Sequence, residues 1–370
     1  MRILRALVAA LLVAAGLAGV MASPAAAEVS DDVDVIVRAN GIVDVNGDNQ
    51  DNHIAICSGD EATDLNVVIF GDEGLSSVVP VSGLTKDLRI NTRSGDDTVS
   101  INGRECLRPG GEEPIEPLDG HLIDIPRDLR IILGAGDDQA SGYGFHVGDD
   151  MTVLGSSGYE SLDFGGFYVE DRMDVNTSSG ESWTVIGEAA MGRSSFRGGN
   201  QNDVMWFFGV DLGVAPRILT LSGSDEVVAI ETIAFGRVTA NTGNGDDIFA
   251  WLDSFCGLHF GGGECCEDGP CCEIGPCCVD DPCCVDDPCC VDDPCIEAQG
   301  EEEEPDFYFN LILGGGDDEA HMAIDLVAED RLQGSGGNAD FLGFFNPGGA
   351  TINGFEFFGE PDPNVFLIFI

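Results

Sequence analysis

Pairs of adjacent aspartates recur along this chain and have the chemistry of a cation site. Four pairs directly follow a glycine: Asp96-Asp97, Asp137-Asp138, Asp246-Asp247 and Asp317-Asp318. Carboxylate oxygens are the ligands that Ca²⁺ prefers, and Ca²⁺ tolerates irregular coordination better than Mg²⁺ does. Gly and Asp also favour tight turns without any metal. Both interpretations, a Ca²⁺ site and a solvated turn, are therefore open for these eight residues.

Cysteines are the second group with distinctive chemistry. They are Cys57, Cys106, Cys256, Cys265, Cys266, Cys271, Cys272, Cys277, Cys278, Cys283, Cys284, Cys289, Cys290 and Cys295. Most lie in a low-complexity repeat of Cys-Cys-Val-Asp-Asp-Pro and its variants. Disulfides are expected for an exported chain, with Cys57 and Cys106 as one possible pair. Thiolate binding of a soft metal is the alternative, although the Cys-x-x-Cys spacing of zinc sites is absent.

Residues 1–27 have the pattern of a secretory signal peptide. A short basic head is followed by an apolar run and by small residues before Glu28. No second apolar stretch is long enough to span a membrane. We therefore expect a secreted or cell-surface protein that does not insert into the membrane after the signal is removed.

The charge of the chain restricts its partners. There are 67 acidic and 16 basic residues, which gives a formal net charge of -51. Nucleic acid is excluded as an expected partner, because its binding depends on Lys and Arg. Cations are the favoured partners, and extracellular polysaccharide or other surface components are also considered. Hydrophobic residues make up 43% of the chain, which is too much for a disordered acidic protein.

The acidic turns belong to an internal repeat. With Gly136 as the anchor, the equivalent positions are Gly158, Gly180, Asn202, Ser224 and Gly245, at steps of 22 or 21 residues. Earlier anchors are residues 50–52, Gly74 and Gly95. Apolar residues alternate with other residues in short runs, which predicts three strands per repeat. The sequence thus predicts an all-β, three-sided parallel β-solenoid with about 22 residues per coil, and an antiparallel sandwich or a propeller is the alternative.

Fixed offsets from each anchor predict the residues of the core. Positions four and six after the anchor include Leu162, Phe164, Trp206, Phe208, Val228 and Ile230. Positions nine and eleven after it include Phe145, Val147, Ile233 and Phe235. Positive charges also keep a spacing of seven to nine residues before their anchors: Lys86, Arg127, Arg172, Arg193, Arg217 and Arg237. These residues are expected to form a column, either an ion-pair ladder with aspartates or a stripe that binds acidic polysaccharide.

The motif Gly-x-Gly-x-Asp-x-apolar carries a family resemblance. Residues 134–140, 243–249 and 314–320 match it, and residues 95–99 match its second half. In these residues the chain resembles the haemolysin-type (RTX) calcium-binding repeats of secreted bacterial proteins. The resemblance implies a β-solenoid with Ca²⁺ in its turns and, residue by residue, the ligands Asp97, Asp138, Asp247 and Asp318. That family repeats about every nine residues, whereas here one such turn occurs per coil.

Longer steps between anchors mark two insertions and set the expected domain boundaries. A loop is expected at residues 105–124, within a first solenoid part at 28–252. The cysteine-rich insertion covers 253–304, and residues 305–370 hold the last coils and a C-terminal cap.

No nucleophile elbow, His-Glu-x-x-His motif or phosphate-binding loop is present, and the histidines are scattered at different offsets. The expected function is therefore a non-catalytic structural or adhesion-type role, with Ca²⁺ as a stabiliser. A carbohydrate-active β-helix enzyme and a metal-sequestering protein are the alternatives.

Overall fold

The computed structural model describes residues 29–30, 33–59, 63–71, 74–102, 106, 122–252, 255–257, 309–325, 331–334, 341–346, 351–353 and 357–359. The predicted signal peptide, the low-complexity cysteine repeat and the final apolar residues lie outside this part of the chain, and so does most of the predicted loop at 105–124. All regular elements in the described part are strands. The predicted all-β class is therefore confirmed. None of the described segments forms a helix long and apolar enough to cross a membrane.

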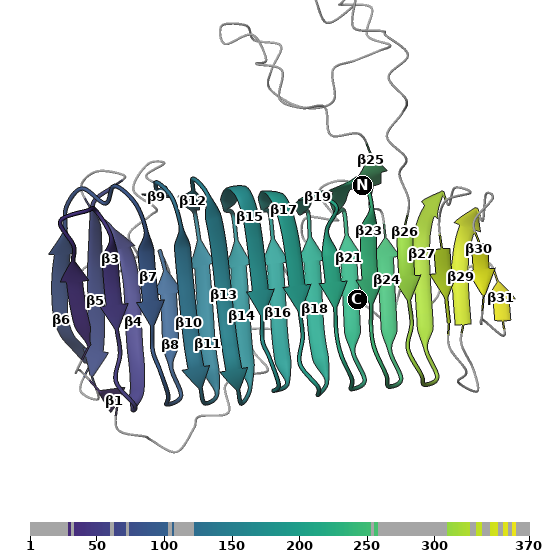
Figure 1. The fold of residues 1–370 in the computed structure, drawn as a ribbon, viewed down its shortest axis with the longest axis horizontal. Coiled ribbons are helices and arrows are strands. Elements are labelled where there is room, and N and C mark those ends of the chain that lie inside the picture. The colour runs from purple at the N-terminus through teal and green to yellow at the C-terminus, as the bar shows by residue number, and fades with distance from the viewer. Residues whose placement is uncertain are drawn as a thin grey trace, which may run out of the picture.

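Two sheets run the length of the molecule, and their strands lie side by side along one long axis (Figure 1). The 14-stranded sheet consists of β1 (Val29–Ser30), β4 (Asp51–Ser58), β5 (Leu65–Gly71), β6 (Gly74–Val81), β8 (Thr98–Ile101), β11 (Asp138–Tyr143), β14 (Glu160–Gly165), β16 (Ser182–Gly187), β18 (Asp203–Phe208), β21 (Glu226–Ile230), β24 (Ile248–Leu252), β27 (Glu319–Asp325), β29 (Phe341–Asn346) and β31 (Phe357–Gly359).

The 17-stranded sheet consists of β2 (Asp34–Val37), β3 (Val43–Asn46), β7 (Leu88–Asn91), β9 (Ile123–Ile125), β10 (Leu129–Ala135), β12 (Phe145–Val147), β13 (Asp150–Ser157), β15 (Tyr168–Asn176), β17 (Ala190–Arg197), β19 (Asp211–Val214), β20 (Arg217–Leu219), β22 (Ile233–Phe235), β23 (Val238–Asn241), β25 (Phe255–Gly257), β26 (Phe309–Ile312), β28 (Arg331–Gln333) and β30 (Thr351–Asn353).

Each coil passes through three strand positions. One coil, for example, runs through β10, β11 and β12 before β13 starts the next. Strands of successive coils pair in parallel, and Asp138 is in register with Glu160, 22 residues further on. In β15 and β17 the third strand of one coil is continuous with the first strand of the next, so two rows of strands belong to one sheet. The predicted parallel β-solenoid with 22-residue coils is confirmed.

The stack continues across both insertions. Gln139 of β11 is in register with Thr98 of β8, although 41 residues separate them. Ile248 of β24 is in register with Glu319 of β27 across 71 residues. Backbone pairing therefore resumes directly after each inserted segment, as a stacked repeat allows when the extra residues leave at a turn.

Inward-facing side chains form one continuous apolar core along the axis. Within it the rings of Phe145 and Phe167 stack at 5.0 Å between centroids, and Phe164 meets Phe145 edge to face at 6.3 Å. All three rings come from positions that the offsets predicted or from their neighbours in the repeat. Equivalent positions of two successive coils thus place Phe145 and Phe167 one above the other.

The expected register is wrong by one residue in two coils. Ser182 of β16 pairs with Asp203 of β18 at a step of 21 residues. The short step therefore comes earlier in the chain than the expected one, which was between Ser224 and Gly245. The anchors of these coils are Gln201 and Gly223, one residue before Asn202 and Ser224. Because side chains alternate between the two faces of a strand, this shift exchanges inside and outside.

Side chains in the shifted coils show the exchange. Met205 and Phe207 are fully buried in the core, whereas Trp206 and Phe208 face outward and are partly exposed. The same correction applies to Ile230, which lies outside the core, and to Ile233, which is 39% exposed. Val228 is buried, but in a separate small cluster on the outer surface.

The N-terminal end departs from the solenoid pattern. Strands β4, β5 and β6 are antiparallel to one another, and so are β2 and β3. Gly74 begins β6 and pairs with Gly71. The expectation that Gly74 is a coil anchor is therefore wrong. His53 of β4 instead pairs directly with Thr98 of β8, 45 residues later.

Candidate functional site

Acidic turns connect the two sheets at one edge of every coil. Gly136 has a φ of 149° and Gly245 a φ of 145°, which only glycine adopts readily. A Cβ on Gly136 would lie 1.8 Å from the carbonyl oxygen of Gly95 in the previous coil. The glycine is therefore required both by backbone conformation and by the close contact between stacked turns.

The second residue of each turn belongs to an inner column. Its side chains are almost fully buried, with at most 1% of their surface exposed. The inner column comprises Asp97, Asp138, Glu160, Ser182, Asp203, Asp225, Asp247 and Asp318.

The first residue of each turn belongs to an outer column at the surface. Its acidic members are Asp51, Asp96, Asp137, Glu181, Asp246 and Asp317. Asp51 is half-buried and the other five are exposed. The two aspartates of each predicted pair thus lie in different environments.

Reciprocal hydrogen bonds join neighbouring turns. The backbone N–H of Asp137 donates to Oδ1 of Asp96 at 2.9 Å, and the N–H of Asp97 donates to Oδ1 of Asp138 at 2.8 Å. Outer carboxylates therefore accept from the following coil and inner carboxylates from the preceding one. The same reciprocal pair connects the last two aspartate turns, at 2.9 and 3.0 Å. Both kinds are hydrogen bonds to a carboxylate, which are stronger than neutral ones when the group is ionised.

Burial dominates the electrostatics of the inner column. It raises the pKa of Asp138 to about 7, and the nearby charges of Asp97 and Asp96 add to the rise. Burial likewise raises the pKa of Glu160 to about 8 and those of Asp225 and Asp247 to about 6. Desolvation penalises the ionised form, so part of this column is protonated near neutral pH.

Two inner carboxyl groups each bury one oxygen that has no hydrogen-bond partner among the described residues. These oxygens are Oδ2 of Asp138 and Oε2 of Glu160. A protonated carboxyl oxygen is less costly to bury than an ionised one. Burial therefore accounts both for the unpaired oxygens and for the raised pKa values.

The eight predicted metal ligands do not gather around one point. Asp97, Asp138, Asp247 and Asp318 are inside, whereas Asp96, Asp137, Asp246 and Asp317 are at the surface. In the described part of the chain, three or more acidic groups come within 4.8 Å of one another at a different place. This acid cluster consists of Asp149, Asp150 and Asp171.

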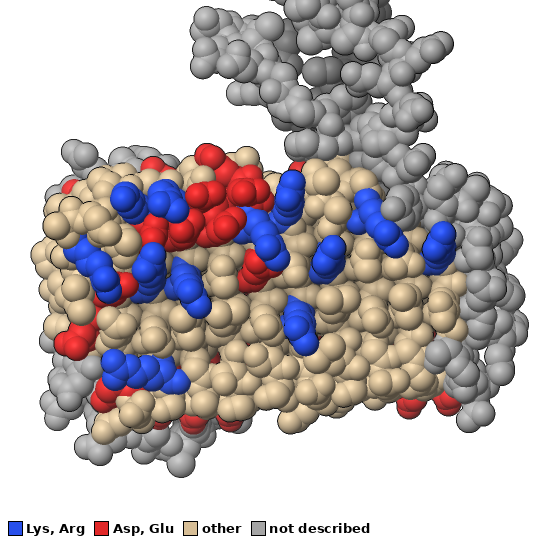
Figure 2. Space-filling model, viewed as in Figure 1, with Lys and Arg blue, Asp and Glu red and all other residues tan. Residues whose placement is uncertain are grey.

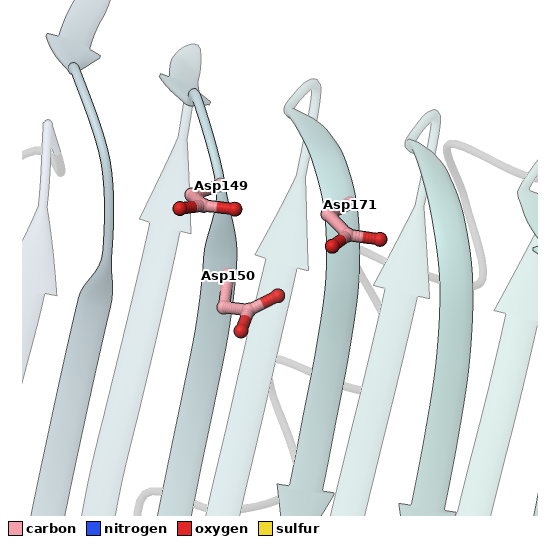
Figure 3. A group of neighbouring side chains, drawn as sticks. All are labelled: Asp149, Asp150 and Asp171. Atoms are coloured by element: carbon pink, nitrogen blue, oxygen red, sulfur yellow. The ribbon is translucent and has the colours of Figure 1, made fainter.

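The acid cluster lies on the outer face of the 17-stranded sheet (Figure 3). Asp149 precedes β13, Asp150 begins it, and Asp171 lies on the neighbouring β15. Nε of Arg127 is 3.8 Å from a carboxylate oxygen of Asp149. Partial burial and the adjacent carboxylates raise the pKa of Asp150. Three oxygen ligands of this kind have the chemistry to hold a hard cation.

Sequence spacing contained a signal for the acid cluster. Residues 149–151 and 171–173 read Asp-Asp-Met and Asp-Arg-Met one period apart, so their acids must stack. The sequence interpretation followed the turn motif, considered Asp171 only as a partner of the basic residues and did not single out Asp149 or Asp150.

His146 is the described histidine with the most acidic surroundings. Its Nδ1 is 2.8 Å from Asp124 and its Nε2 is 3.2 Å from Glu170, on the coils before and after it. The ring also stacks on Tyr168 at 5.5 Å. Both ring nitrogens are engaged, so the geometry describes a surface contact among three coils.

The basic residues share a face but not a single column. Arg172 is in register with Arg193, as expected. Arg217, however, is in register with Ser195, two residues further along its strand. Nε of Arg127 lies 4.0 Å from Asp87 on the preceding coil and 3.8 Å from Asp149 on the following one, so part of the face is an ion-pair ladder.

Cys57 and Cys106 form a disulfide. Their predicted pairing is confirmed. Cys256 lies in β25, where its side chain is not described, and the remaining eleven cysteines lie outside the described residues.

Comparison with protein-family models, curated proteins and solved structures gives no match. The likeness to haemolysin-type repeats is therefore supported only as far as the solenoid arrangement.

Proposed function

We propose that this chain is an exported, non-catalytic β-solenoid with a structural or adhesion-type role outside the cell or at its surface. The observation that carries the proposal is that the carboxylates of the repeated acidic motif join neighbouring coils to one another. Each described carboxylate of the reciprocal pairs accepts a backbone N–H from a neighbouring coil. The most regular polar residues of the sequence are thus explained by the scaffold itself.

Export is supported by two independent features. Residues 1–27 have the pattern of a cleaved signal, and Cys57 and Cys106 form a disulfide of the kind found in oxidising compartments. Mass spectrometry of the protein from the culture medium or cell surface tests this part. We expect a mature N-terminus at Glu28. An intact N-terminus in the cytoplasm would contradict export.

The rival function is a carbohydrate-active enzyme. Incubation of the mature protein with a panel of acidic polysaccharides, followed by chromatography of the products, distinguishes the two. The structural proposal predicts unchanged polymer length with every substrate. Shortened or unsaturated products would overturn it.

Ca²⁺ is proposed as a stabiliser at the outer column. An outer carboxylate uses one oxygen for the next coil, and its side chain remains at the surface. Adjacent outer aspartates also repel one another, which a bound cation would relieve. Ca²⁺ that binds only the folded protein should raise the melting temperature. At a Ca²⁺ concentration of 100 times Kd it adds about 2.7 kcal/mol to the free energy of unfolding.

Two matched variants locate the ion. The outer variant carries Asp96→Asn, Asp137→Asn, Asp246→Asn and Asp317→Asn, and the cluster variant carries Asp149→Asn, Asp150→Asn and Asp171→Asn. Each is melted with Ca²⁺ and with chelator. We expect the outer variant to lose the Ca²⁺ response and the cluster variant to keep it. The reverse result would move the ion to the acid cluster, and identical melting of the unmodified protein in both solutions would remove Ca²⁺ from the proposal.

A further inference from the structure

The basic residues of this acidic protein are confined to one side. Every described lysine and arginine lies in a strand of the 17-stranded sheet or in a turn next to one. The strands of the 14-stranded sheet contain none. Figure 2 shows this face, with blue side chains spread along it and a compact red group among them.

Along this face the charge changes sign. β17, β20, β23, β26 and β28 contain four arginines and no acidic residue. In a chain with 67 acidic and 16 basic residues, such a stretch is not expected from composition. The acidic residues of the same row of strands lie on the N-terminal side, in and before β13 and β15.

Three arginines form a compact group on this stretch. Arg217 is in register with Ser195, and Arg193 and Arg197 lie two residues to either side of Ser195 on β17. Because side chains alternate along a strand, all of them point to the same outer face. We call Arg193, Arg197 and Arg217 the arginine cluster. All three are exposed, and within the described residues none has an acidic group at ion-pair distance.

The two clusters are close neighbours in the stack. Asp150 is in register with Arg172, and Arg172 with Arg193. The acid cluster therefore reaches from the start of β13 to Asp171, which lies next to Arg172 on β15, and the arginine cluster begins on the next coil. Arg172 itself pairs with Asp174 at 2.6 Å. From β13 to β20 the order along the axis is acidic, then mixed, then basic, whereas before β13 the same sheet also carries Arg89, Arg127 and Arg130.

Each cluster concentrates charge of one sign. One oxygen from each residue of the acid cluster lies within 4.8 Å of the others, and Arg127, at 3.8 Å from Asp149, is the only described basic residue at ion-pair distance from them. Like charges at such distances repel by roughly 1 kcal/mol per pair even in water. A counter-charge from outside the chain would relieve the repulsion in both clusters.

The geometry points to a second copy of this chain as the partner of this face. In an antiparallel pair related by a two-fold axis, the acid cluster of each copy lies on the arginine cluster of the other. Such an interface is isologous, so both contacts form at once. Electrostatic complementarity of this kind fixes register and orientation.

An anionic polymer fits the face less well. A polymer running along the axis would meet the carboxylate of Asp171 beside Arg172 and that of Asp150 on the preceding coil, whereas an antiparallel copy satisfies both clusters. The formal charge of -51 opposes unspecific association of two copies. Association therefore depends on this local match, and changing the charges of one cluster should abolish it.

Charge exchange between the clusters tests the pairing. The acidic variant carries Arg193→Glu, Arg197→Glu and Arg217→Glu, and the basic variant carries Asp149→Lys, Asp150→Lys and Asp171→Lys. Sedimentation equilibrium of the full mature chain at about 0.15 M salt, where the Debye length is about 8 Å, gives the mass. We expect a dimer for the unmodified protein, a monomer for each variant alone and a dimer for their equimolar mixture.

Controls separate the local contact from net charge and folding. The control Glu181→Lys, Glu188→Lys, Glu231→Lys has the same net charge as the basic variant, but its changes lie in exposed turns at the sheet edges. We expect it to remain a dimer. A neutral variant, Arg193→Gln, Arg197→Gln, Arg217→Gln, provides the same test if the acidic variant does not fold, and should also be monomeric.

Three results would overturn the inference. They are a monomeric unmodified protein, a dimer that both charge variants retain, and a mixture that stays monomeric. A monomer that acidic polysaccharide retards through the arginine cluster would in addition assign that cluster to a polymer.

Discussion

The inner and outer columns place the same residue type in opposite surroundings. Asp137 and Asp138 are adjacent, and the N–H groups that each accepts come from neighbouring coils at 2.9 and 2.8 Å. Asp137 is exposed, whereas Asp138 is fully buried with its pKa raised to about 7. One turn motif therefore combines a solvated anion with a carboxyl group that is easily protonated.

The largest expected effect is a dependence of stability on pH. A buried acid whose pKa rises from near 4 to about 7 binds more protons in the folded than in the unfolded protein between these values. Its stabilising contribution is complete below the unfolded pKa and is lost as pH rises through the folded pKa. Because several inner carboxyls share this shift, we expect thermal melting to occur several degrees higher at pH 5 than at pH 8.

A variant distinguishes the inner column from general surface repulsion, which also weakens in acid. Asp138→Asn with Glu160→Gln keeps oxygen acceptors but removes two groups whose pKa values are raised to about 7 and about 8. The change in melting temperature between pH 5 and 8 should become clearly smaller. An unchanged pH dependence would mean that surface charge alone causes it.

The next effect separates the two columns directly. Asp138→Ala removes the acceptor of the buried Asp97 N–H and leaves a small cavity, so it should cost about 2–3 kcal/mol. Asp137→Ala removes an acceptor at the surface, where water replaces it, and should cost less than about 1 kcal/mol. Urea unfolding of both variants measures the difference. Equal losses would show that burial does not distinguish the columns.

The smallest effect concerns Ser182, an inner position that is occupied by a serine instead of an acid. The hydroxyl of Ser182 donates to Oδ1 of Asp203 at 2.6 Å, next to Glu160 in the preceding coil. Ser182→Asp replaces this donor with another buried carboxyl and should cost about 1 kcal/mol at pH 8. Most of the loss should disappear at pH 5, where the new group is protonated. Unfolding at the two pH values, with Ser182→Asn as the uncharged control, provides the measurement.

Periodicity was the part of the fold that sequence could predict. The return of Gly and Asp every 22 residues, with apolar residues at fixed offsets, predicted the parallel coils and their core at Leu162, Phe164, Phe145 and Val147. A repeat makes this possible because one local pattern, once recognised, applies to every coil.

One short step could not be located by the pattern. Asn202-Asp203 fits a turn in either register, and both Met205-Phe207 and Trp206-Phe208 are apolar alternating pairs. Only backbone pairing of Ser182 with Asp203 decides between them. Where both faces of a strand are apolar, alternation loses its power to fix register.

The separation of the two columns was also beyond the sequence. Asp137 and Asp138 are chemically identical in the chain, and only the direction of the following strand places one inside. The arginine cluster in turn depends on the one-residue shift, which brings Arg193 into register with Arg172.

The antiparallel strands at the N-terminal end have a consequence for contacts between molecules. Parallel solenoids expose an unpaired row of N–H and C=O groups that another chain could extend. Here β4, β5 and β6 turn back on one another, so β6 is the final strand of the long sheet and carries Pro80, which lacks an N–H. We therefore expect this terminus to oppose end-to-end polymerisation into fibres.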